Sequence, residues 1–238
     1  MKLKNQVAIV TGAGRGIGRA VALAFAREGA AVALAARTTT ELETVAAQIR
    51  SRAGRALVVP TDVTREASVS ALVEHVLADF KKVDILLTAS GMATFASLVD
   101  TKPEDWDRMM AANVRGVFLV CRAVLPSMMR QRRGTIINIV SVAAKRAIAG
   151  GAAYAASKHA VLGLTQVLAE EMRSHGVRVG ALSPGAVDTG LWDAVPNPPE
   201  RSRMLRPEDV AEAAVLMASL PPGASLEDLT LLPAAGIL

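Results

Sequence analysis

The residue pair best suited to chemistry is Tyr154 and Lys158, four positions apart in the stretch Ala-Ala-Tyr-Ala-Ala-Ser-Lys. This spacing predicts that both side chains lie on one face of a helix, one turn apart. A phenol ordinarily keeps its proton up to about pH 10, and a neighbouring ammonium group favours the phenolate. The pair therefore predicts a tyrosine with a lowered pKa that exchanges protons near neutral pH, as carbonyl/alcohol interconversion requires. An exposed lysine beside a half-buried tyrosine is the alternative.

A glycine-rich turn near the N-terminus points to nucleotide binding. It connects an expected strand to an expected helix that begins at Gly16. Glycines let the backbone turn sharply and approach a ligand, and a helix N-terminus attracts phosphate. We therefore expect a cofactor diphosphate here, although a purely structural turn has the same composition. The spacing is G-x-x-x-G-x-G, and the residues expected to contact the cofactor are Gly12, Gly14, Arg15, Gly16, Ile17 and Gly18.

The end of the second expected strand bears on the choice of nicotinamide cofactor. An acidic residue about 20 positions past a dinucleotide-binding loop binds the ribose 2′-hydroxyl of NAD. Here the strand ends in Arg37, and the first acid is Glu41. Arg37 is suited to pair with a 2′-phosphate, assisted by Arg15, because guanidinium groups match phosphate geometry. The sequence therefore favours NADP(H) over NAD(H), unless Arg37 is an ordinary solvated arginine.

Strand-like and helix-like segments alternate along the chain and must position these residues. Strands are expected at residues 7–10, 31–35, 56–59, 84–87, 135–140, 177–182 and 229–232, and helices at 16–28, 40–52, 66–80, 103–129, 152–175 and 208–218. The alternation predicts an α/β Rossmann fold, a doubly wound, mostly parallel sheet of about seven strands with helices on both faces. A single domain over residues 1–238 is expected, because no linker, repeat or low-complexity tract interrupts the pattern.

The interval 184–207 is different, because it lacks clear periodicity and contains several prolines. It follows the C-terminal end of an expected strand, which is the edge where ligands bind in such sheets. Loops of this length are usually functional or disordered. We expect this segment to cover the substrate, and a surface connection without function is the alternative.

The composition restricts the classes of function. The net charge is +5, but basic residues are scattered and aromatic residues make up 3%, which argues against nucleic-acid binding. No apolar run reaches the roughly 18 residues needed to span a bilayer, so no membrane segment is expected. The single Cys121 excludes a disulfide framework and a multi-cysteine metal site. We expect a cytoplasmic protein without a metal.

Together these residues resemble the short-chain dehydrogenase/reductase family over nearly the whole chain. The segment from Thr11 to Gly18 resembles the T-G-x-x-x-G-x-G loop of the family, and Tyr154 with Lys158 resembles its catalytic pair. The other matching positions follow in the family's order: Asp62 and Val63 near the adenine, Gly91 near the cofactor, Asn113 and Ser141 in the catalytic set, and Pro184, Gly185, Val187 and Thr189 beside the nicotinamide.

The resemblance implies a mechanism. Ser141 would hydrogen-bond the substrate oxygen, and Tyr154 would donate a proton to that oxygen on reduction or accept one on oxidation. Lys158 would lower the pKa of the tyrosine and hold the nicotinamide ribose. Asn113 would anchor a water that links Lys158 to solvent.

Two departures from the family pattern affect these expectations. The segment Thr88–Gly91 stands where the family commonly has Asn-Asn-Ala-Gly, so we expect the loss of hydrogen bonds that brace the central sheet. The chain also ends in residues 232–238 without the Asp-Gly-Gly turn of many ketoacyl reductases. The second departure falls in a part that shapes substrate choice or assembly.

The resulting functional hypothesis is a 3-oxoacyl-[acyl-carrier-protein] reductase-like enzyme. A general short-chain alcohol, aldehyde or sugar dehydrogenase is the alternative, and a cofactor-sensing binding protein is the non-enzyme alternative. The cluster Arg130, Arg132 and Arg133 is a candidate docking site for an acyl carrier protein, or else it complements a helix C-terminus.

The resemblance also implies a homo-oligomer, either a dimer or a tetramer. An apolar helix face of Val161, Leu164 and Leu168 fits an interface between copies or the core of one chain equally well.

Overall fold

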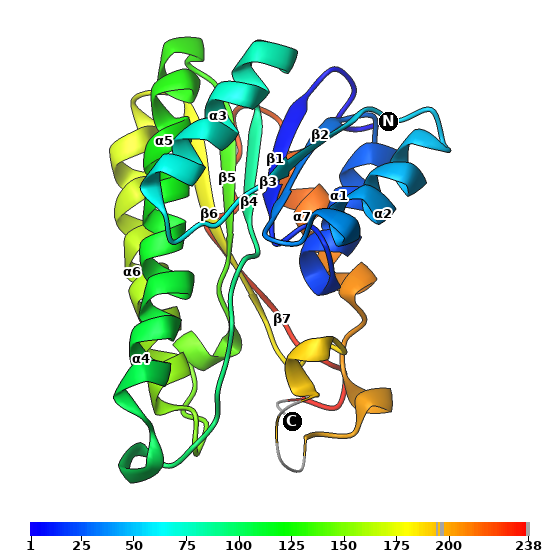
Figure 1. The fold of residues 1–238 in the computed structure, drawn as a ribbon. Coiled ribbons are helices and arrows are strands. Elements are labelled where there is room, and N and C mark those ends of the chain that lie inside the picture. Colours follow the sequence, from blue (N-terminus) through cyan, green and yellow to red (C-terminus); the bar gives the residue numbers. More distant parts are fainter. Residues whose placement is uncertain (194, 196–197, 237–238) are drawn as a thin grey trace.

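Seven strands form one parallel sheet in the order β3-β2-β1-β4-β5-β6-β7 (Figure 1). The computed structural model describes residues 1–193, 195 and 198–236, so Pro196 of the proline-rich interval and the last two residues lie outside the described part. The strands are β1 (Val7–Thr11), β2 (Ala31–Ala36), β3 (Ala56–Pro60), β4 (Ile85–Thr88), β5 (Gly134–Ile139), β6 (Val177–Pro184) and β7 (Asp228–Leu231). This order confirms the predicted doubly wound fold. The chain reverses direction across the sheet between β1 and β4, and such a switch point opens a ligand crevice at the C-terminal strand ends.

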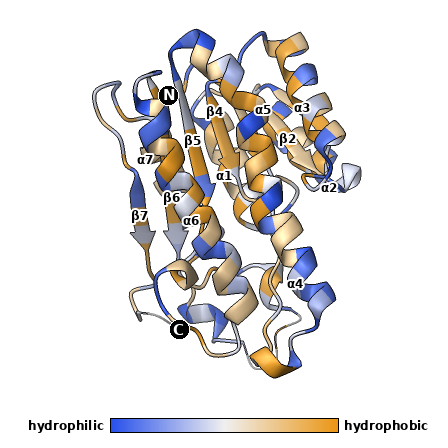
Figure 2. Cartoon of the chain, turned by 90° about the vertical axis from the view of Figure 1, so that its left-hand side faces the viewer, coloured by the Kyte–Doolittle hydropathy of each residue, from blue (hydrophilic) through white to orange (hydrophobic). Residues whose placement is uncertain are grey.

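Helices cover both faces of the sheet, as predicted (Figure 1). One layer contains α1 (Gly16–Arg27), α2 (Thr39–Arg50) and α7 (Pro207–Ala218), and the other contains α3 (Glu66–Phe80), α5 (Gly116–Gln131) and α6 (Ala152–Arg173). Alternate residues of β1 serve the two cores: Ala8 and Val10 face the first layer, whereas Val7 and Ile9 face the second. Both sides of the central strands are therefore apolar, and Figure 2 shows these strands as largely hydrophobic between the helices.

The long helix expected over residues 103–129 is divided into three parts. α4 (Pro103–Met109) leads into a π-helical segment, η2 (Met110–Arg115), which continues directly into α5. The extra residue in a π turn shifts the following side chains around the helix axis, and such turns occur often at functional sites. Asn113 lies in this segment and is buried. The described part of the chain also contains four short 3-10 turns, η1 (Leu98–Asp100), η3 (Val142–Ala144), η4 (Gly190–Trp192) and η5 (Arg201–Arg203).

The same continuous stretch, Pro103–Gln131, is long and apolar enough by length and composition to cross a bilayer. The expectation that no segment would meet this condition is therefore wrong. Its side chains Val117, Val124 and Met128 are buried against the sheet together with strand residues. Core helices of globular domains meet the same condition, so the stretch is weak evidence for a membrane.

The predicted loss of bracing at Thr88–Gly91 does not occur at its first position. The hydroxyl of Thr88 on β4 donates to Oδ1 of Asn138 on β5 at 2.8 Å, and Nδ2 of Asn138 donates to Thr165 Oγ1 on α6 at 2.9 Å. Asn138 is fully buried, so these bonds satisfy polar groups that water does not reach. A threonine and an asparagine on neighbouring strands therefore tie the sheet to α6.

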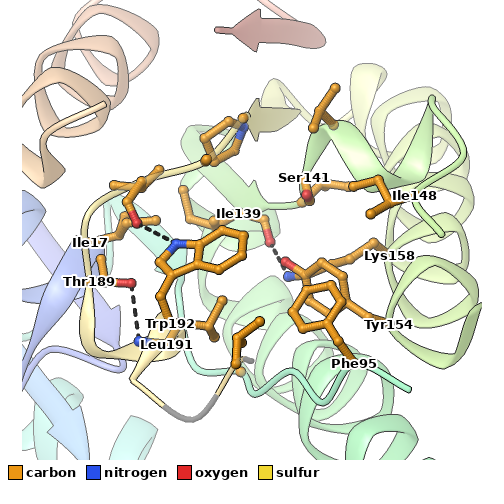
Figure 3. A pocket seen from close by; sticks show the side chains of 18 of the residues that line it. Ile17, Phe95, Ile139, Ser141, Ile148, Tyr154, Lys158, Thr189, Leu191 and Trp192 are labelled. Carbon is orange, nitrogen blue, oxygen red and sulfur yellow. Dashed lines mark hydrogen bonds between the residues drawn. The ribbon is translucent and has the colours of Figure 1, made fainter. Parts of the chain in front are cut away.

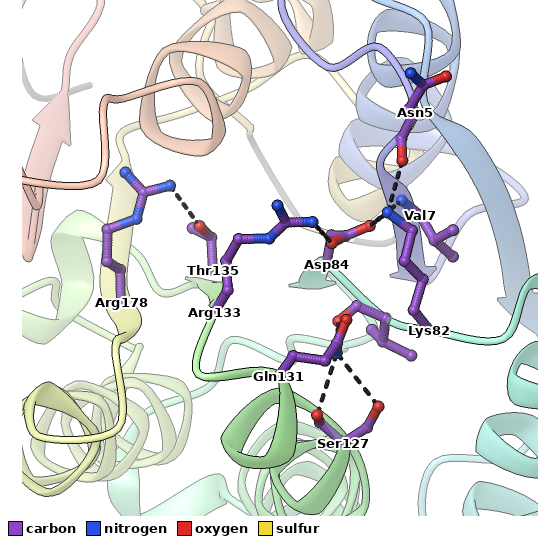
Figure 4. Close-up of polar contacts among 10 residues, drawn as sticks. Asn5, Val7, Lys82, Asp84, Ser127, Gln131, Arg133, Thr135 and Arg178 are labelled. Carbon is purple, nitrogen blue, oxygen red and sulfur yellow. Dashed lines mark hydrogen bonds and ion pairs between the residues drawn. The ribbon is translucent and has the colours of Figure 1, made fainter.

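Arg133 stabilises the fold at the N-terminal edge of the sheet (Figure 4). The buried Asp84 carboxylate accepts from the Val7 amide at 2.9 Å and pairs with Lys82 at 2.7 Å and with Arg133 at 2.6 Å. Arg132 donates to the carbonyl of Ser174 at 3.0 Å. This edge is separated from the C-terminal strand ends by the length of a strand, about 20 Å for six residues. Two arginines of the predicted docking cluster thus serve the fold, far from the ligand crevice.

The apolar face of α6 belongs to the core of the single chain. Val161 is fully buried, Leu168 is nearly so, and Leu164 packs against the same core from its edge. The large apolar side chains exposed on the two neighbouring helices are Phe118 of α5 and Val167 of α6. The homo-oligomer stays a prediction.

Candidate active site

The glycine loop between β1 and α1 is shaped so tightly that side chains are excluded. Gly12 has a positive φ of 67°, and a Cβ there would lie 2.7 Å from the carbonyl oxygen of Ala89. A Cβ at Gly18 would lie 2.2 Å from the carbonyl oxygen of Gly12. The hydroxyl of Thr11 accepts from the amides of Ala89 and Ser90 at 3.2 and 3.3 Å and so joins the loop to the segment after β4. The first backbone amides of α1, which have no hydrogen-bond partner within the helix, therefore face a cavity.

That cavity has a volume of about 330 Å³ and lies over the C-terminal ends of β1, β2 and β4. It gathers most of the residues predicted to contact the cofactor: Gly12, Gly14, Arg15, Gly16, Ile17, Gly18, Arg37, Asp62, Val63, Gly91 and Thr189. Hydrogen bonds from the side chain and amide of Thr64, together with the positive charge of Arg37, lower the pKa of Asp62 below its ordinary value. Asp62 is therefore an ionised acceptor at neutral pH.

Besides Asp62, three charged residues line this cavity. Arg15 and Arg37 are exposed and line it, as the sequence analysis predicts for a phosphate-binding site. Glu41 lines it as well, and its Oε2 leans over the glycine loop, 2.7 Å from where a Cβ at Gly14 would lie. In the sequence Glu41 is only the first acid after β2, and its position over Gly14 follows from the start of α2 at Thr39.

A second cavity of about 350 Å³ adjoins the first and contains three of the four predicted catalytic side chains, those of Ser141, Tyr154 and Lys158 (Figure 3). Ser141 follows β5, and its Oγ accepts from the amide of Ala143 at 3.1 Å, which fixes the side chain at the start of η3. Tyr154 and Lys158 lie one turn apart on α6 and both line the cavity. Pro184, Gly185, Val187 and Thr189, at and beyond the end of β6, complete the predicted set on the opposite wall.

Asn113 lines neither cavity but organises the segment between them. Its Oδ1 accepts from the amide of Met92 at 2.9 Å, and its Nδ2 donates to the carbonyl of Met92 at 2.9 Å and to Ser157 Oγ at 3.0 Å. Ser157 in turn donates to the carbonyl of Tyr154 at 2.7 Å. The side-chain amide of Asn113 therefore serves the protein, so an anchored water must bind Asn113 through its backbone carbonyl or the second lone pair of Oδ1.

The arrangement agrees with comparisons to known proteins. The family model for short chain dehydrogenase matches residues 6–199. The chain belongs to the short-chain dehydrogenase/reductase family. An uncharacterised oxidoreductase of Staphylococcus aureus is 36% identical, with 97% of this chain and 98% of that protein covered. A 3-oxoacyl-[acyl-carrier-protein] reductase of Thermotoga maritima is 33% identical, with 92% of each covered. The crystal structure of a metagenomic short-chain oxidoreductase in complex with NADP matches with a TM-score of 0.87 and 34% identity, covering 98% of this chain and 99% of that one.

A short-chain dehydrogenase/reductase uses a nicotinamide cofactor, and the residues of this chain fit one. Glycine at positions 12 and 18 lets the loop backbone pack against itself and against Ala89, where no side chain fits, and this keeps the loop beside the free amides of α1. The two adjoining cavities share Ile17, Gly91 and Thr189, so one elongated molecule can reach from Arg37 to Tyr154. The cofactor supplies a hydride when bound, and the protein must supply the proton and the orientation.

Burial, and not Lys158, sets the direction in which the pKa of Tyr154 shifts. Burial raises the pKa of the Tyr154 phenol above its ordinary value, and a hydrogen bond with Ser141 offsets part of this increase. The prediction of a pKa lowered by Lys158 is therefore wrong for this structure. Lys158 Nζ donates to the carbonyl of Ile139 at 2.9 Å and lies 5.7 Å from the centroid of the Tyr154 ring. Both groups share one apolar pocket, and desolvation disfavours each charged form.

Burial affects Lys158 as well. Burial lowers its pKa from 10.5 to about 8, so charged and neutral forms coexist near neutral pH. The sequence indicated the lysine but not its burial, because the segment Ala152–Lys158 has the same composition on an exposed helix. The sequence analysis also missed Met92 and Ser157, which touch Asn113, and the aromatic residues Phe95 and Trp192 of the second cavity.

The lowered pKa of Lys158 predicts a stability difference that depends on pH. Below pH 8 both the folded and unfolded states carry the proton, and the folded state bears the full cost of burying it. From pH 8 upward the folded state releases the proton before the unfolded state does, so stability rises. Between pH 8 and 9.5 the free energy of unfolding should rise by about 1.5 kcal/mol relative to Lys158→Met. Urea unfolding of both proteins at several pH values measures this. A constant difference across that range would contradict the buried, titrating lysine.

Proposed function

We propose that this protein is an NADP(H)-dependent oxidoreductase that interconverts a ketone or 3-oxoacyl group and a secondary alcohol. The observation that carries the proposal is the placement of Tyr154. It lines an apolar cavity together with Ser141 and Lys158, and this cavity adjoins a cleft built around a tightly packed, glycine-rich loop. A hydroxyl that can give a proton thus lies next to a site suited to hydride transfer.

Ser141, Tyr154 and Lys158 have different roles in proton transfer, and Asn113 has a positioning role. Ser141 Oγ is held by the Ala143 amide and is free to donate its own hydrogen to a substrate oxygen. Tyr154 donates the proton that turns this oxygen into a hydroxyl. Lys158, with a pKa of about 8, is suited to return a proton to the tyrosine, because both of its forms are populated near neutral pH. Asn113 helps to fix the spacing between α6, which carries Tyr154, and the segment after β4. It does so through its hydrogen bonds to Ser157 and Met92.

The raised pKa of Tyr154 favours reduction near neutral pH. A protonated phenol is the form that donates a proton to a carbonyl oxygen, and burial keeps the tyrosine in this form. Oxidation begins with the tyrosine accepting a proton, which requires the phenolate. We therefore propose carbonyl reduction as the direction favoured at neutral pH.

The preference for NADP(H) rests on Arg15 and Arg37. Both guanidinium groups are exposed at the far end of the cleft, where a 2′-phosphate would add two negative charges. The related structure that contains NADP supports the same choice by similarity. Glu41 and the ionised Asp62 line the same cavity and are the acids that oppose it.

Two narrower functions fit the same site. The relative from Thermotoga maritima supports a 3-oxoacyl-[acyl-carrier-protein] reductase, whereas the position of Arg132 and Arg133 at the opposite edge of the sheet argues against their docking a carrier protein. A short-chain alcohol or aldehyde dehydrogenase needs no such docking. NADPH consumption against acetoacetyl thioesters, diketones and aldehydes separates the two, and absence of turnover with all of them would favour a cofactor-sensing binding protein.

The role of Tyr154 is tested by Tyr154→Phe. This change removes only the hydroxyl, so NADPH binding should be unchanged while kcat falls by about 100-fold or more, the usual contribution of a general acid. Fluorescence titration measures NADPH affinity, and NADPH oxidation measures turnover. Turnover within a few-fold of that of the unmodified protein would remove Tyr154 from the mechanism.

The cofactor preference is tested by Arg37→Ala. Loss of one charged hydrogen bond to phosphate should weaken NADPH binding by about tenfold or more and leave NADH binding nearly unchanged. Arg19→Ala is a matched control, because Arg19 lies on the neighbouring helix α1 and donates to Gln48. Equal weakening of both nucleotides, or tighter binding of NADH by the unmodified protein, would contradict the assignment.

A further inference from the structure

The second cavity contains an unexpected share of the aromatic side chains. The chain has only four phenylalanines, two tryptophans and one tyrosine. Three of these residues, Phe95, Tyr154 and Trp192, line this one cavity. Most of the core is built from small aliphatic residues, so packing of the fold does not by itself account for this concentration.

The three rings form a continuous wall. Phe95 and Trp192 are stacked, with centroids 5.9 Å apart and planes inclined by 10°. Phe95 also meets Tyr154, with centroids 5.7 Å apart and planes inclined by 50°. Both arrangements are favourable aromatic contacts. The wall therefore runs directly up to the proton donor, as the labelled side chains in Figure 3 show.

The wall joins two loops from different strands, and both are held in place. Phe95 lies in the segment after β4, where the amide of Ala96 donates to the carbonyl of Gly150 at 2.8 Å. Trp192 lies in η4 after β6, and its indole nitrogen donates to the carbonyl of Val187 at 2.9 Å. Arg201 further anchors the second loop through Asp188 at 2.7 Å and Asp193 at 2.6 Å. The aromatic surface is thus formed before a substrate arrives.

The rest of the lining is neutral. Among the described residues that line this cavity, Lys158 is the only charged one, and its ammonium group donates to the carbonyl of Ile139. A substrate carboxylate or phosphate placed beside the aromatic wall would lose its water without gaining a partner. The volume of about 350 Å³ is near the lower end of ligand pockets and includes the residues assigned to the nicotinamide.

We infer that the substrate is a compact, neutral ketone with an aromatic or other flat ring, and that Phe95 and Trp192 determine this specificity. This inference rests on the proposed carbonyl reduction and names its substrate class. The carbonyl oxygen meets Ser141 and Tyr154, while the ring packs along the wall formed by Phe95 and Trp192. An extended acyl thioester does not use this surface.

Rates with three ketones test the inference: acetophenone, the open-chain 2-octanone, and 4-acetylbenzoate, which adds a charge to the ring. With NADPH, the unmodified protein should have a kcat/KM for acetophenone about tenfold above that for 2-octanone, and 4-acetylbenzoate should be the poorest. Phe95→Ala and Trp192→Ala should each lower the acetophenone value by about tenfold and the 2-octanone value by about twofold or less.

Two control variants separate the aromatic surface from general damage. Trp192→Phe keeps a ring but loses the bond to Val187, and it should retain the preference for acetophenone. Trp106→Ala changes the other tryptophan, which lies on α4, and should leave all three rates unchanged. Equal losses for acetophenone and 2-octanone in Trp192→Ala, or equal rates with acetophenone and 4-acetylbenzoate in the unmodified protein, would overturn the inference.

A binding measurement keeps the test independent of turnover and of the folding of the alanine variants. Trp106→Phe leaves Trp192 as the only tryptophan, so its emission reports on the wall. In the presence of saturating NADP, acetophenone should quench this emission at about tenfold lower concentration than 2-octanone. Such a preference without turnover of any carbonyl would contradict the proposed function alone. Turnover without any difference in quenching would contradict the aromatic specificity alone.

Discussion

The side-chain amide of Asn113 connects three segments that are far apart in the sequence. It fixes the backbone of Met92 after β4 through both the amide and the carbonyl, and it holds Ser157, which bonds to the carbonyl of Tyr154. Asn113 reaches these partners from a π turn, where the helix from Pro103 to Gln131 changes its register. Because the amide is buried, each of these bonds is costly to leave unmade. This one side chain therefore helps to set the spacing between the segment after β4 and α6, which carries Tyr154 and Lys158.

Burial then sets the acid–base properties of the site. The pocket that contains Tyr154 and Lys158 raises the pKa of the phenol and lowers the pKa of the ammonium group to about 8. The two shifts have opposite directions but one cause, since low polarity disfavours whichever form is charged. The tyrosine therefore keeps the proton that a carbonyl needs, and the lysine can both hold and release one near neutral pH. The same apolar surroundings exclude charged substrates beside the wall formed by Phe95 and Trp192.

Local sequence patterns predicted the elements of the fold and the glycine loop, whereas Asn113 and Ser141 were indicated only by the resemblance to the family. The alternation of segments indicates the sheet, and Gly12 and Gly18 are required because no side chain fits there. Properties that depend on contacts between distant segments were not predictable. Thr88 and Asn138 form a bond only because β4 and β5 pair in that register. From the sequence, Arg133 was a candidate for docking a carrier protein or for complementing a helix C-terminus, but in the fold it pairs with Asp84. The pKa of Tyr154 was predicted in the wrong direction because periodicity does not reveal how deeply a helix face is buried.

The protonation of Tyr154 is the central claim, and the chain allows a direct measurement of it. Tyr154 is the only tyrosine in 238 residues, so the ultraviolet absorbance of tyrosinate reports on this residue alone. A pH titration of the folded protein, with circular dichroism to confirm that it stays folded, should show the phenolate appearing only above about pH 10, the ordinary value for tyrosine. Lys158→Met, titrated in the same way, shows how much the lysine contributes. Appearance of tyrosinate near neutral pH in the unmodified protein would contradict the account, because Lys158 would then outweigh burial.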